Sequence, residues 1–308
     1  MSDSVVSAVV VTYNPDRGTL LNLLRALAPQ VRQIVVADNG ATQWLEAQIN
    51  AEGWTNVSRK DMGGNVGIGR ALNIAFEELR SAGDSWVITF DQDSLPPQGM
   101  VDALKATACK LLETGEKCAA VGPAFFDERS GVPKRYPFFK RDGFKVRRIY
   151  PPASQNVAVM CDSLITSGML VSMKAWVSTG GFDEGMFVDY TDTEWCFRAG
   201  SQGWHFYGLP CVAMSHELSE SAPRISFGLI FLSYSPLRRY FYARNTIAVC
   251  LRSYTHPVYR LRLLVGLIIR FPVWAFTDTH RVAAIRATLR GVRDGLSGRL
   301  GASSLGVK

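Results

Sequence analysis

The chain has 308 residues, of which 47% are hydrophobic and 20% are charged. This composition is that of a folded protein with room for one large core or two smaller ones, and it excludes an intrinsically disordered chain. The net charge of +7 is uneven, because positions 236–308 hold thirteen Lys and Arg against two Asp, a local charge of +11 that leaves the remainder at −4. The body is therefore not expected to bind nucleic acid, whereas the tail is expected to meet something anionic.

Short apolar runs alternate with helical patterns over the first 90 residues. Strands are predicted at 5–11, 33–37 and 86–90, with a weaker one around Val57, and helices at 20–27, 42–51 and 66–80. This alternation predicts an α/β protein with a doubly wound, mainly parallel sheet. Polar residues follow each strand, which predicts a site along the carboxyl edge of the sheet.

The pattern changes after about Met100. Positions 122–152 are broken by Pro and Gly and rich in Lys and Arg, and we expect loops and short strands that line an acceptor site. The later elements expected are a strand around Ser167, a helix at 193–199, one or two strands at 204–215 bent at Pro210, a loop at 218–226, and helices from Pro236 onward. We therefore expect a body of 1–235, whose pattern changes at about 100, and a basic, amphipathic helical tail of 236–308.

Two carboxylates close the apolar run 86–90. Asp91 and Asp93 lie one residue apart, so both side chains can point to the same side at the carboxyl end of a strand. Two hard oxygen ligands there suit Mg²⁺ or Mn²⁺, and such a cation suits a diphosphate. An isolated Asp-x-Asp is common, however, and is equally typical of a plain surface turn.

Two further segments combine polar and glycine residues. Positions 63–70, Gly-Gly-Asn-Val-Gly-Ile-Gly-Arg, open a helix and either approach a phosphate or sugar or form an ordinary tight turn. Positions 180–198 hold five carboxylates among aromatic residues. Within them Glu194 and Arg198 have the spacing of a structural salt bridge, whereas Asp192 is either a helix N-cap or a general base whose pKa the aromatic surroundings raise.

His216 follows a strand-like stretch and is a candidate third metal ligand beside Asp93, although a lone His is more often structural. The six cysteines are scattered and are expected to be reduced thiols, forming neither a disulfide framework nor a zinc site. The start, Met1-Ser2-Asp3-Ser4, has no secretory pattern, and we expect a cytoplasmic protein.

Taken in order along the chain, these pieces resemble the inverting glycosyltransferases of family 2, which have the GT-A fold, and within them the bacterial rhamnosyltransferases. The resemblance runs from Val9 to about Asn245. It implies that the body of 1–235 is a catalytic domain, with a nucleotide-binding half to about 100 and an acceptor-binding half at 101–235. Its motifs are positions 10–14, 36–40, 64–69 with Asn73, 91–93, 180–184, 189–198, 216 and 239–245. One departure is that many relatives have Glu-Asp where this chain has Thr191-Asp192, so the usual base is present and its acidic neighbour is missing.

The resemblance implies a role for each matching residue. The nucleotide and donor site would be formed by Thr12, Tyr13, Asn14, Asp38, Gly64, Asn65, Gly67, Arg70 and Asp91. Mg²⁺ or Mn²⁺ would be bound by Asp93 and His216, with Asp91 touching the metal or the ribose. Asp192 would take the proton from an acceptor hydroxyl in a single displacement with inversion.

The implied enzyme takes a nucleotide-sugar donor, with dTDP-L-rhamnose favoured, and a glycan or lipid-linked acceptor. Within this class, a UDP-sugar such as UDP-galactofuranose is an alternative donor. Outside it, the alternatives are a nucleotidyltransferase and a non-catalytic, lectin-like subunit. A nucleotidyltransferase predicts a Gly-rich loop with Lys after the first strand, where this chain has Thr12-Tyr13-Asn14-Pro15.

The tail adds a membrane hypothesis. Positions 261–276 are very apolar, but Arg262, Arg270 and Pro272 interrupt them, and the clean run 263–269 is far shorter than the roughly 20 residues of a spanning helix. The tail instead fits helices lying on an anionic membrane, at the inner face of the bacterial cytoplasmic membrane, through Arg238, Arg239, Arg244, Arg252, Arg260 and Arg262. The alternatives are a helical cap on the body and a homo-oligomer interface. We expect the first tail helix, with Tyr240, Tyr242 and Asn245, to pack on the body, and 259–276 to meet lipid.

Overall fold

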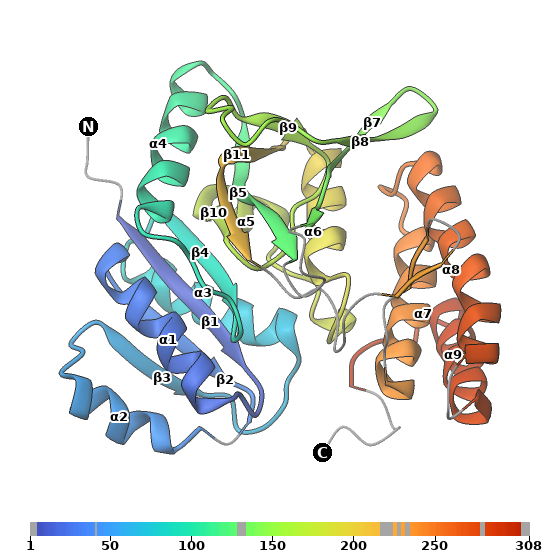
Figure 1. Ribbon diagram of the computed structural model, residues 1–308, viewed down its shortest axis with the longest axis horizontal. Coiled ribbons are helices and arrows are strands. Elements are labelled where there is room, and N and C mark those ends of the chain that lie inside the picture. Colours follow the sequence, from blue (N-terminus) through green and yellow to red (C-terminus); the bar gives the residue numbers. More distant parts are fainter. Residues whose placement is uncertain are drawn as a thin grey trace.

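The computed structural model describes residues 5–40, 42–127, 134–215, 224–226, 229–231, 235–277 and 281–302. Within these residues a mixed sheet of nine strands lies between helices on both faces (Figure 1). Its strands are β1 (Val6–Thr12), β2 (Ile34–Asp38), β3 (Val57–Asp61), β4 (Trp86–Asp91), β5 (Cys118–Asp127), β6 (Lys134–Arg135), β9 (Val159–Cys161), β10 (Met169–Ser172) and β11 (His205–Ser215). Their order is β3-β2-β1-β4-β10-β5-β11-β9, with β6 paired to β5. Separate hairpins are formed by β7 (Phe138–Asp142) with β8 (Lys145–Ile149), and by β12 (Arg224–Ser226) with β13 (Leu229–Phe231).

The first half of the sheet has the predicted topology. Strands β3, β2, β1 and β4 run parallel, and Val10 lies level with Val36 of β2 and Phe90 of β4. The strands are connected by α1 (Arg17–Leu27), the 3₁₀ helix η1 (Ala28–Gln30), α2 (Trp44–Glu52) and α3 (Ile68–Ser81). The doubly wound, mainly parallel α/β fold is confirmed, and β10 makes the sheet mixed because it runs antiparallel to β4 and β5.

Alternate residues of the central strands fill two separate cores. Val10 faces a cluster with Leu24 of α1 and Leu104 of α4 (Met100–Glu113), whereas Val9 faces a cluster with Phe76 of α3. The second cluster also includes side chains from α5 (Met173–Thr179) and α6 (Thr191–Ser201). Burial on both faces explains why positions 5–11 are a continuous apolar run instead of an alternating one.

Helix α4 and most of β5 were not predicted from the sequence. Positions 118–127 form one buried strand between β10 and β11, where we expected loops and short strands from 122 onward. Small residues and the Gly122-Pro123 pair weaken the local strand signal. Gly122 leaves little room for a side chain, because a Cβ there would lie 3.0 Å from Leu164 Cδ2. Packing between two strands therefore overrides the local propensity.

Strand β11 confirms the bend expected near Pro210. It is a single strand whose register against β5 shifts between Leu209 and Ala213. Of the loop predicted at 218–226, positions 218–223 lie outside the described residues, and 224–226 form β12. The six cysteines are free thiols, as expected.

The C-terminal region is helical, as predicted, with α7 (Pro236–Leu251), α8 (Pro257–Thr277) and α9 (Arg281–Leu296). Helix α7 packs on the body: Phe241 stacks on Phe187 with ring centroids 5.1 Å apart, and Val249 shares an apolar cluster with Met186. The segment 182–190 of the body includes the 3₁₀ helix η2 (Glu184–Met186). None of the helices in the described ranges is long and apolar enough to cross a membrane.

Two arginines of α7, Arg239 and Arg244, turn inward, which corrects the expectation that they meet lipid. Arg244 is fully buried and donates to the backbone oxygens of Gly185 and Met186, each at 2.9 Å. Arg239 is buried as well. Two further arginines form ion pairs with carboxylates, Arg238 with Asp189 (3.2 Å) and Arg252 with Asp183 (2.6 Å). Arg260, in α8, donates to the backbone oxygen of Thr255 at 2.7 Å. Because α7 packs on the body, its buried arginines reach fixed acceptors there, whereas Arg238 and Arg252 pair with carboxylates and stay about one-third exposed.

Two glycines bring α9 against α7. A Cβ at Gly291 would overlap the backbone oxygen of Tyr240, and one at Gly295 would lie 2.6 Å from that of Arg244. Between them, the Tyr240 hydroxyl donates to Asp294 at 3.0 Å. The contact between the two helices therefore needs the absence of a side chain at both positions.

Gly291→Ala should destabilise the protein by about 1–3 kcal/mol, the usual cost of overpacking a tight contact. The measurement is urea unfolding followed by circular dichroism. Gly200→Ala is the matched control, because Gly200 also lies in a helix and has open space around its Cα. The control should be stabilised by roughly 0.5–1 kcal/mol through helix propensity. Equal stability of the Gly291 variant and the parent would contradict the packing argument.

Candidate functional site

The predicted polar residues gather at the carboxyl ends of β1, β2 and β4. Asp91 lies level with Val11 of β1, so the turn after β4 lies beside the turn after β1. The Tyr13 backbone N–H donates to the Gln92 side chain at 2.7 Å and joins the two turns. Asp93 is exposed and Asp91 is half-buried at this edge.

A short segment between β9 and β10 connects the Asp91–Asp93 turn to Asp192. The Ser167 hydroxyl hydrogen-bonds with the hydroxyl of Ser94, at the end of that turn. The neighbouring Thr166 N–H donates to Asp192 Oδ2 at 3.1 Å. Asp192 is thereby brought to the same edge of the sheet as Asp91 and Asp93, which are about 100 residues earlier in the chain.

The charges of these carboxylates act on one another. Burial and the neighbouring charges of Asp93 and Asp192 raise the pKa of Asp91 to about 7, and the positive charge of Arg238 opposes that rise. Burial also raises the pKa of Asp192, while hydrogen bonds from Thr193 and Thr166 act in the other direction. Such a cluster of acids is stabilised by any cation that enters it.

The structure separates the alternatives for the acidic segment. The N-cap of α6 is Tyr190, so Asp192 lies inside the first turn and is not the cap. Its Oδ1 accepts from the Thr193 N–H at 2.6 Å, and the residue is half-buried. Glu194 forms the predicted salt bridge with Arg198 at 2.7 Å and is fully buried, so it is not available as a base.

The backbone that leads into Asp192 is held in an unusual conformation. Phe187, Asp189 and Tyr190 have φ values of 63°, 59° and 66°, in the left-handed region that L-residues rarely adopt. The Asn245 amide of α7 donates to the backbone oxygens of Met186, Val188 and Asp189 at 2.8, 2.7 and 2.9 Å.

The sequence reasoning did not assign this holding role. Asn245 formed part of the resemblance through positions 239–245, but no local pattern says which backbone it binds. Arg238, which the sequence analysis placed at a membrane, lies instead beside Asp189 and influences Asp91. Neither role is visible without the tertiary contact between α7 and the body.

Two predicted nucleoside contacts are inaccessible. Thr12 and Asp38 are fully buried. Asp38 accepts hydrogen bonds from the Gly40 and Thr42 N–H groups, at 3.0 and 3.1 Å, and pairs with Arg59 at 2.9 Å. Their burial supports an indirect role, in which they shape the turns after β1 and β2, while Tyr13 and Asn14 are exposed.

The Gly-rich segment divides into two parts. A Cβ at Gly67 would lie 2.7 Å from Phe187 Cδ2, and one at Gly69 would lie 2.9 Å from the Asp183 backbone oxygen, so these glycines serve packing. Gly64 is exposed and has a φ of 135°, and a Cβ there would meet no atom within 4 Å. Asn65 accepts from the Gly67 N–H at 3.1 Å, and Arg70 is exposed. Only the part around Gly64 is free to approach a ligand.

The donor set fits a hard divalent cation. Asp91 and Asp93 supply carboxylate oxygens, and Mg²⁺ commonly uses one or two carboxylates together with diphosphate oxygens. Within the described ranges, no three His, Cys, Asp or Glu side chains are grouped as a complete metal cage. The third predicted ligand, His216, lies outside the described residues, but its neighbour Ser215 pairs with Leu95 in an isolated bridge, so β11 ends next to the Asp91–Asp93 turn.

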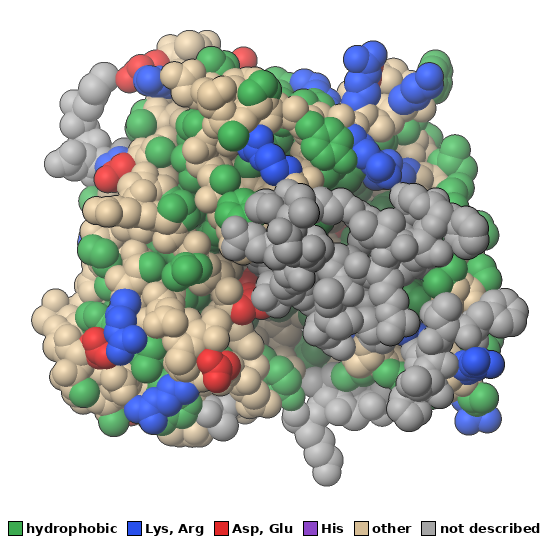
Figure 2. All heavy atoms as spheres, viewed as in Figure 1, with side chains coloured by type: hydrophobic (Ala, Val, Ile, Leu, Met, Phe, Trp, Pro, Cys, Tyr) green, Lys and Arg blue, Asp and Glu red, His purple; other side chains and the backbone are tan. Residues whose placement is uncertain are grey.

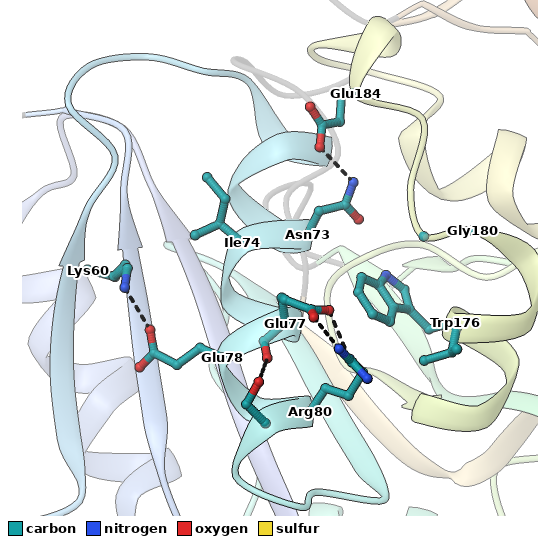
Figure 3. Close-up of a pocket in the computed structure, with 12 residues that line it drawn as sticks. Lys60, Asn73, Ile74, Glu77, Glu78, Arg80, Trp176, Gly180 and Glu184 are labelled. Carbon is teal, nitrogen blue, oxygen red and sulfur yellow. Dashed lines mark hydrogen bonds and ion pairs between the residues drawn. The ribbon is translucent and has the colours of Figure 1, made fainter.

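A groove of about 940 Å³ lies elsewhere, between α3 and α5 (Figure 3). Lys60 and Glu78 pair across one rim at 3.0 Å, and Trp176 lies on the opposite side. The groove is lined by none of the three carboxylates of the carboxyl edge. Its position therefore does not mark the predicted site.

Residues 7–155 match the protein family described as Glycosyl transferase family 2. Over 301 residues the chain is 28% identical to dTDP-rhamnosyl transferase RfbF of Shigella flexneri, a match that covers 97% of this chain and 98% of that protein. Over 245 residues it is 27% identical to N-acetylglucosaminyl-diphospho-decaprenol L-rhamnosyltransferase of Mycobacterium tuberculosis, covering 71% of this chain and 78% of that protein.

Solved structures show the same fold. GalNAc-T7 with UDP, GalNAc and Mn²⁺ matches with a TM-score of 0.56 and 14% identity, over 91% of this chain and 59% of that one. S. aureus TarS 1-349 in complex with UDP-GlcNAc matches with a TM-score of 0.54 and 16% identity, over 96% and 83%. At these identities the likeness concerns the fold alone, and it confirms the expected GT-A fold.

Asn245→Ala should release the left-handed stretch before Asp192. The two N–H groups of the Asn245 amide are shared among three backbone oxygens, so the variant loses about two hydrogen bonds, each worth about 0.5–1.5 kcal/mol. Its free energy of unfolding should therefore fall by roughly 1–3 kcal/mol. Urea unfolding measures the loss. Asn50→Ala, at an exposed position of α2, is the control and should change stability by less than about 0.5 kcal/mol. If both variants were equally stable, Asn245 would not hold the stretch.

Proposed function

Because this chain carries a family 2 glycosyl transferase domain and is a glycosyltransferase, we propose that it transfers L-rhamnose from dTDP-L-rhamnose to a hydroxyl group of a lipid-linked or cell-surface glycan. The observation that supports this donor is the near full-length similarity to a dTDP-rhamnosyl transferase. A glycosyltransferase is neither a nucleotidyltransferase nor a non-catalytic, lectin-like subunit, so those alternatives are set aside. A UDP-sugar stays the second candidate donor, because the fold is shared with a UDP-GlcNAc complex.

Asp192 is the proposed general base. Its half-buried position and raised pKa suit a carboxylate that accepts the proton of an acceptor hydroxyl. As the acceptor oxygen attacks the anomeric carbon, its proton passes to Asp192 and the bond from that carbon to the diphosphate oxygen breaks. The attack comes from the face opposite the leaving group, so the configuration of the sugar is inverted.

The opposite side of the site is proposed to hold the diphosphate. Asp91 and Asp93, with His216, would bind Mg²⁺ or Mn²⁺, and such a cation neutralises the charge of a departing diphosphate when it is bound. Arg238 adds a fixed positive charge close to Asp91 and is supported by its ion pair with Asp189. We propose that it helps to hold the diphosphate.

The other proposed contacts with the sugar donor are made by side chains and backbone that are exposed or partly exposed to solvent. Tyr13 and Asn14 are accessible for the pyrimidine nucleoside, while Thr12 and Asp38 act through the shape of their turns. We propose that the backbone at Gly64, with Asn65 and Arg70, approaches the donor, whereas Gly67 acts indirectly through its packing against Phe187.

The acceptor is proposed to bind in the half formed by 101–235. A lipid-linked acceptor would bring the enzyme to the inner face of the cytoplasmic membrane, as a peripheral protein. Exposed apolar side chains on α8 support this location, among them Leu261 and Ile268, at 66% and 69% exposure. A homo-oligomer formed through the same helices is the competing proposal.

Asp192→Asn should retain donor binding and lose the chemical step. The amide is nearly isosteric but does not accept the proton, so kcat should fall by roughly 10² or more with little change in donor affinity. The assay is rhamnosyl transfer to an acceptor analogue, with donor affinity measured by calorimetry. Asp102→Asn is the matched control, because Asp102 is an exposed carboxylate in the first turn of α4, and its variant should be as active as the parent. A kcat within about threefold of the parent would assign Asp192 a structural role.

Asp93→Ala should remove the metal-dependent part of donor binding while the fold survives, because the side chain is exposed. Thermal unfolding with dTDP-rhamnose, UDP-GlcNAc and UDP-galactofuranose, each with and without Mn²⁺, measures this. A bound donor at 100 times its Kd stabilises the parent by about 2.7 kcal/mol, and the variant should show little of this gain. Glu113→Ala, at another exposed carboxylate, should behave as the parent. A larger shift with a UDP-sugar than with dTDP-rhamnose would change the assigned donor.

A further inference from the structure

The β7–β8 hairpin carries an exposed aromatic side chain at its tip. The hairpin projects from the catalytic domain next to α8 (Figure 1). After the turn at Gly143, Phe144 is 95% exposed, more than any other large hydrophobic side chain in the described ranges. A Phe in this position gains nothing from its own fold and is available to an apolar environment outside the protein.

The strands below this tip are basic. The hairpin contains one acidic residue, Asp142, which pairs with Arg147 at 2.5 Å. Lys140 lies directly opposite Arg147, and like charges in such positions weaken a hairpin. The other basic residues of the hairpin are Lys140, Arg141, Lys145 and Arg148. Their side chains form no ion pair with a carboxylate in the described part of the chain. The hairpin therefore holds an excess of positive charge that an external anion would neutralise.

Helix α8 extends this surface. Leu261, Val265 and Ile268 are exposed by 66, 42 and 69%, and their spacing places them on one face of the helix. Arg262 borders that face, and its guanidinium lies 4.8 Å from the ring centroid of Phe139 in β7. Burial, and to a lesser extent the nearby charge of Arg148, lower the pKa of Arg262, so Arg148 of β8 and Arg262 of α8 are neighbours.

Basic and hydrophobic side chains thus occur together on this part of the molecule. Figure 2 shows Lys and Arg side chains next to hydrophobic ones at the upper right, where Figure 1 places the hairpin. We name this region the hairpin–α8 surface; it comprises Arg141, Phe144, Lys145, Arg147, Arg148, Leu261, Val265 and Ile268.

We propose that the hairpin–α8 surface docks the catalytic domain on an anionic lipid bilayer, with Phe144 inserted between the lipid headgroups and the surrounding Lys and Arg bound to lipid phosphates. An aromatic tip within a basic ring is complementary to the apolar and anionic layers of such a surface. The inference rests on the proposed function in one respect, since a lipid-linked acceptor requires the enzyme at a membrane. It assigns the hairpin, which the sequence placed in an acceptor-lining segment, to the lipid surface beside that acceptor.

A second copy of the chain is a poorer occupant of the same surface. In a two-fold dimer the patch would meet itself, so the basic hairpin of one subunit would face basic residues of the other. Protein interfaces also exclude Lys from their centres, whereas here Lys145 directly follows the apolar tip. The charge of the surface therefore favours lipid.

The test is co-sedimentation of the full chain with vesicles of phosphatidylcholine, alone or mixed with phosphatidylglycerol, at low and high salt. The parent should bind the phosphatidylglycerol vesicles at low salt and bind more weakly at high salt. Phe144→Ala should reduce this affinity at least about tenfold, since the apolar contribution of one ring is lost. Phe144→Trp should restore binding, and its indole emission should shift to shorter wavelength on insertion.

Further variants test the basic residues of the hairpin and compare them with exposed residues elsewhere on the surface. Lys145→Glu with Arg148→Glu should also weaken binding, and should reduce its dependence on salt. Leu112→Ala and Lys110→Glu, both on exposed positions of α4, should bind as the parent does. Because Phe144 is almost fully exposed, unchanged thermal unfolding of its variants is expected and excludes a folding defect as the cause.

Several results would overturn the proposal. These are the absence of parent binding to anionic vesicles at low salt, parent-like binding of Phe144→Ala, and a concentration-dependent dimer that Phe144→Ala abolishes while vesicle binding persists. Rhamnosyl transfer to a soluble acceptor analogue keeps the two proposals apart, because Phe144→Ala should not alter it. Vesicle binding that depends on Phe144 without any transfer would refute the proposed function alone, and transfer without such binding would refute the docking surface alone.

Discussion

The left-handed backbone at Phe187, Asp189 and Tyr190 is the constraint on which the rest of the site depends. Each such residue costs on the order of 1–3 kcal/mol, and the stretch ends directly before the helix that contains Asp192. The compensation comes from outside the catalytic sheet, where Asn245 binds three backbone oxygens of the stretch. The position of the proposed base is therefore determined by a helix more than fifty residues further along the chain.

This dependence makes the C-terminal helices part of the site's framework. Helix α7 supplies the amide of Asn245 and the buried guanidinium of Arg244, and α9 supports α7 through the glycine contacts at 291 and 295. The basic character of the tail thus has two separate origins. The arginines of α7 are directed at backbone oxygens and carboxylates of the body, whereas Arg262 of α8 lies over the hairpin ring of Phe139.

The electrostatics of the carboxyl edge follow from its construction. Asp91, Asp93 and Asp192 lie close together at that edge, and their mutual repulsion adds to burial in raising the pKa of Asp91. A cluster of acids at a sheet edge is costly for folding unless cations offset it. Arg238 supplies one fixed positive charge, and a divalent cation with the donor diphosphate is the proposed counterpart on the ligand side. The same repulsion that opposes folding would strengthen the binding of that cation.

The sequence by itself determined those features that are encoded in neighbouring residues. Alternating strands and helices over the first 90 positions predicted the parallel half of the sheet, and the polar residues that end each strand, Asp91 and Asp93 among them, predicted its carboxyl edge. The i, i+4 spacing of Glu194 and Arg198 likewise predicted their salt bridge, which the structure has at 2.7 Å.

Only the tertiary structure decided features that arise from contacts between distant segments. It placed β5 in the sheet although its small residues are weak strand formers. It also buried Asp38, which pairs with Arg59, and packed Gly67 against Phe187. Arg239 and Arg244 of α7 were turned inward by the same kind of contact. The physical reason is that hydrogen bonding, burial and close packing depend on which segments meet, and local sequence patterns do not contain the partner's position.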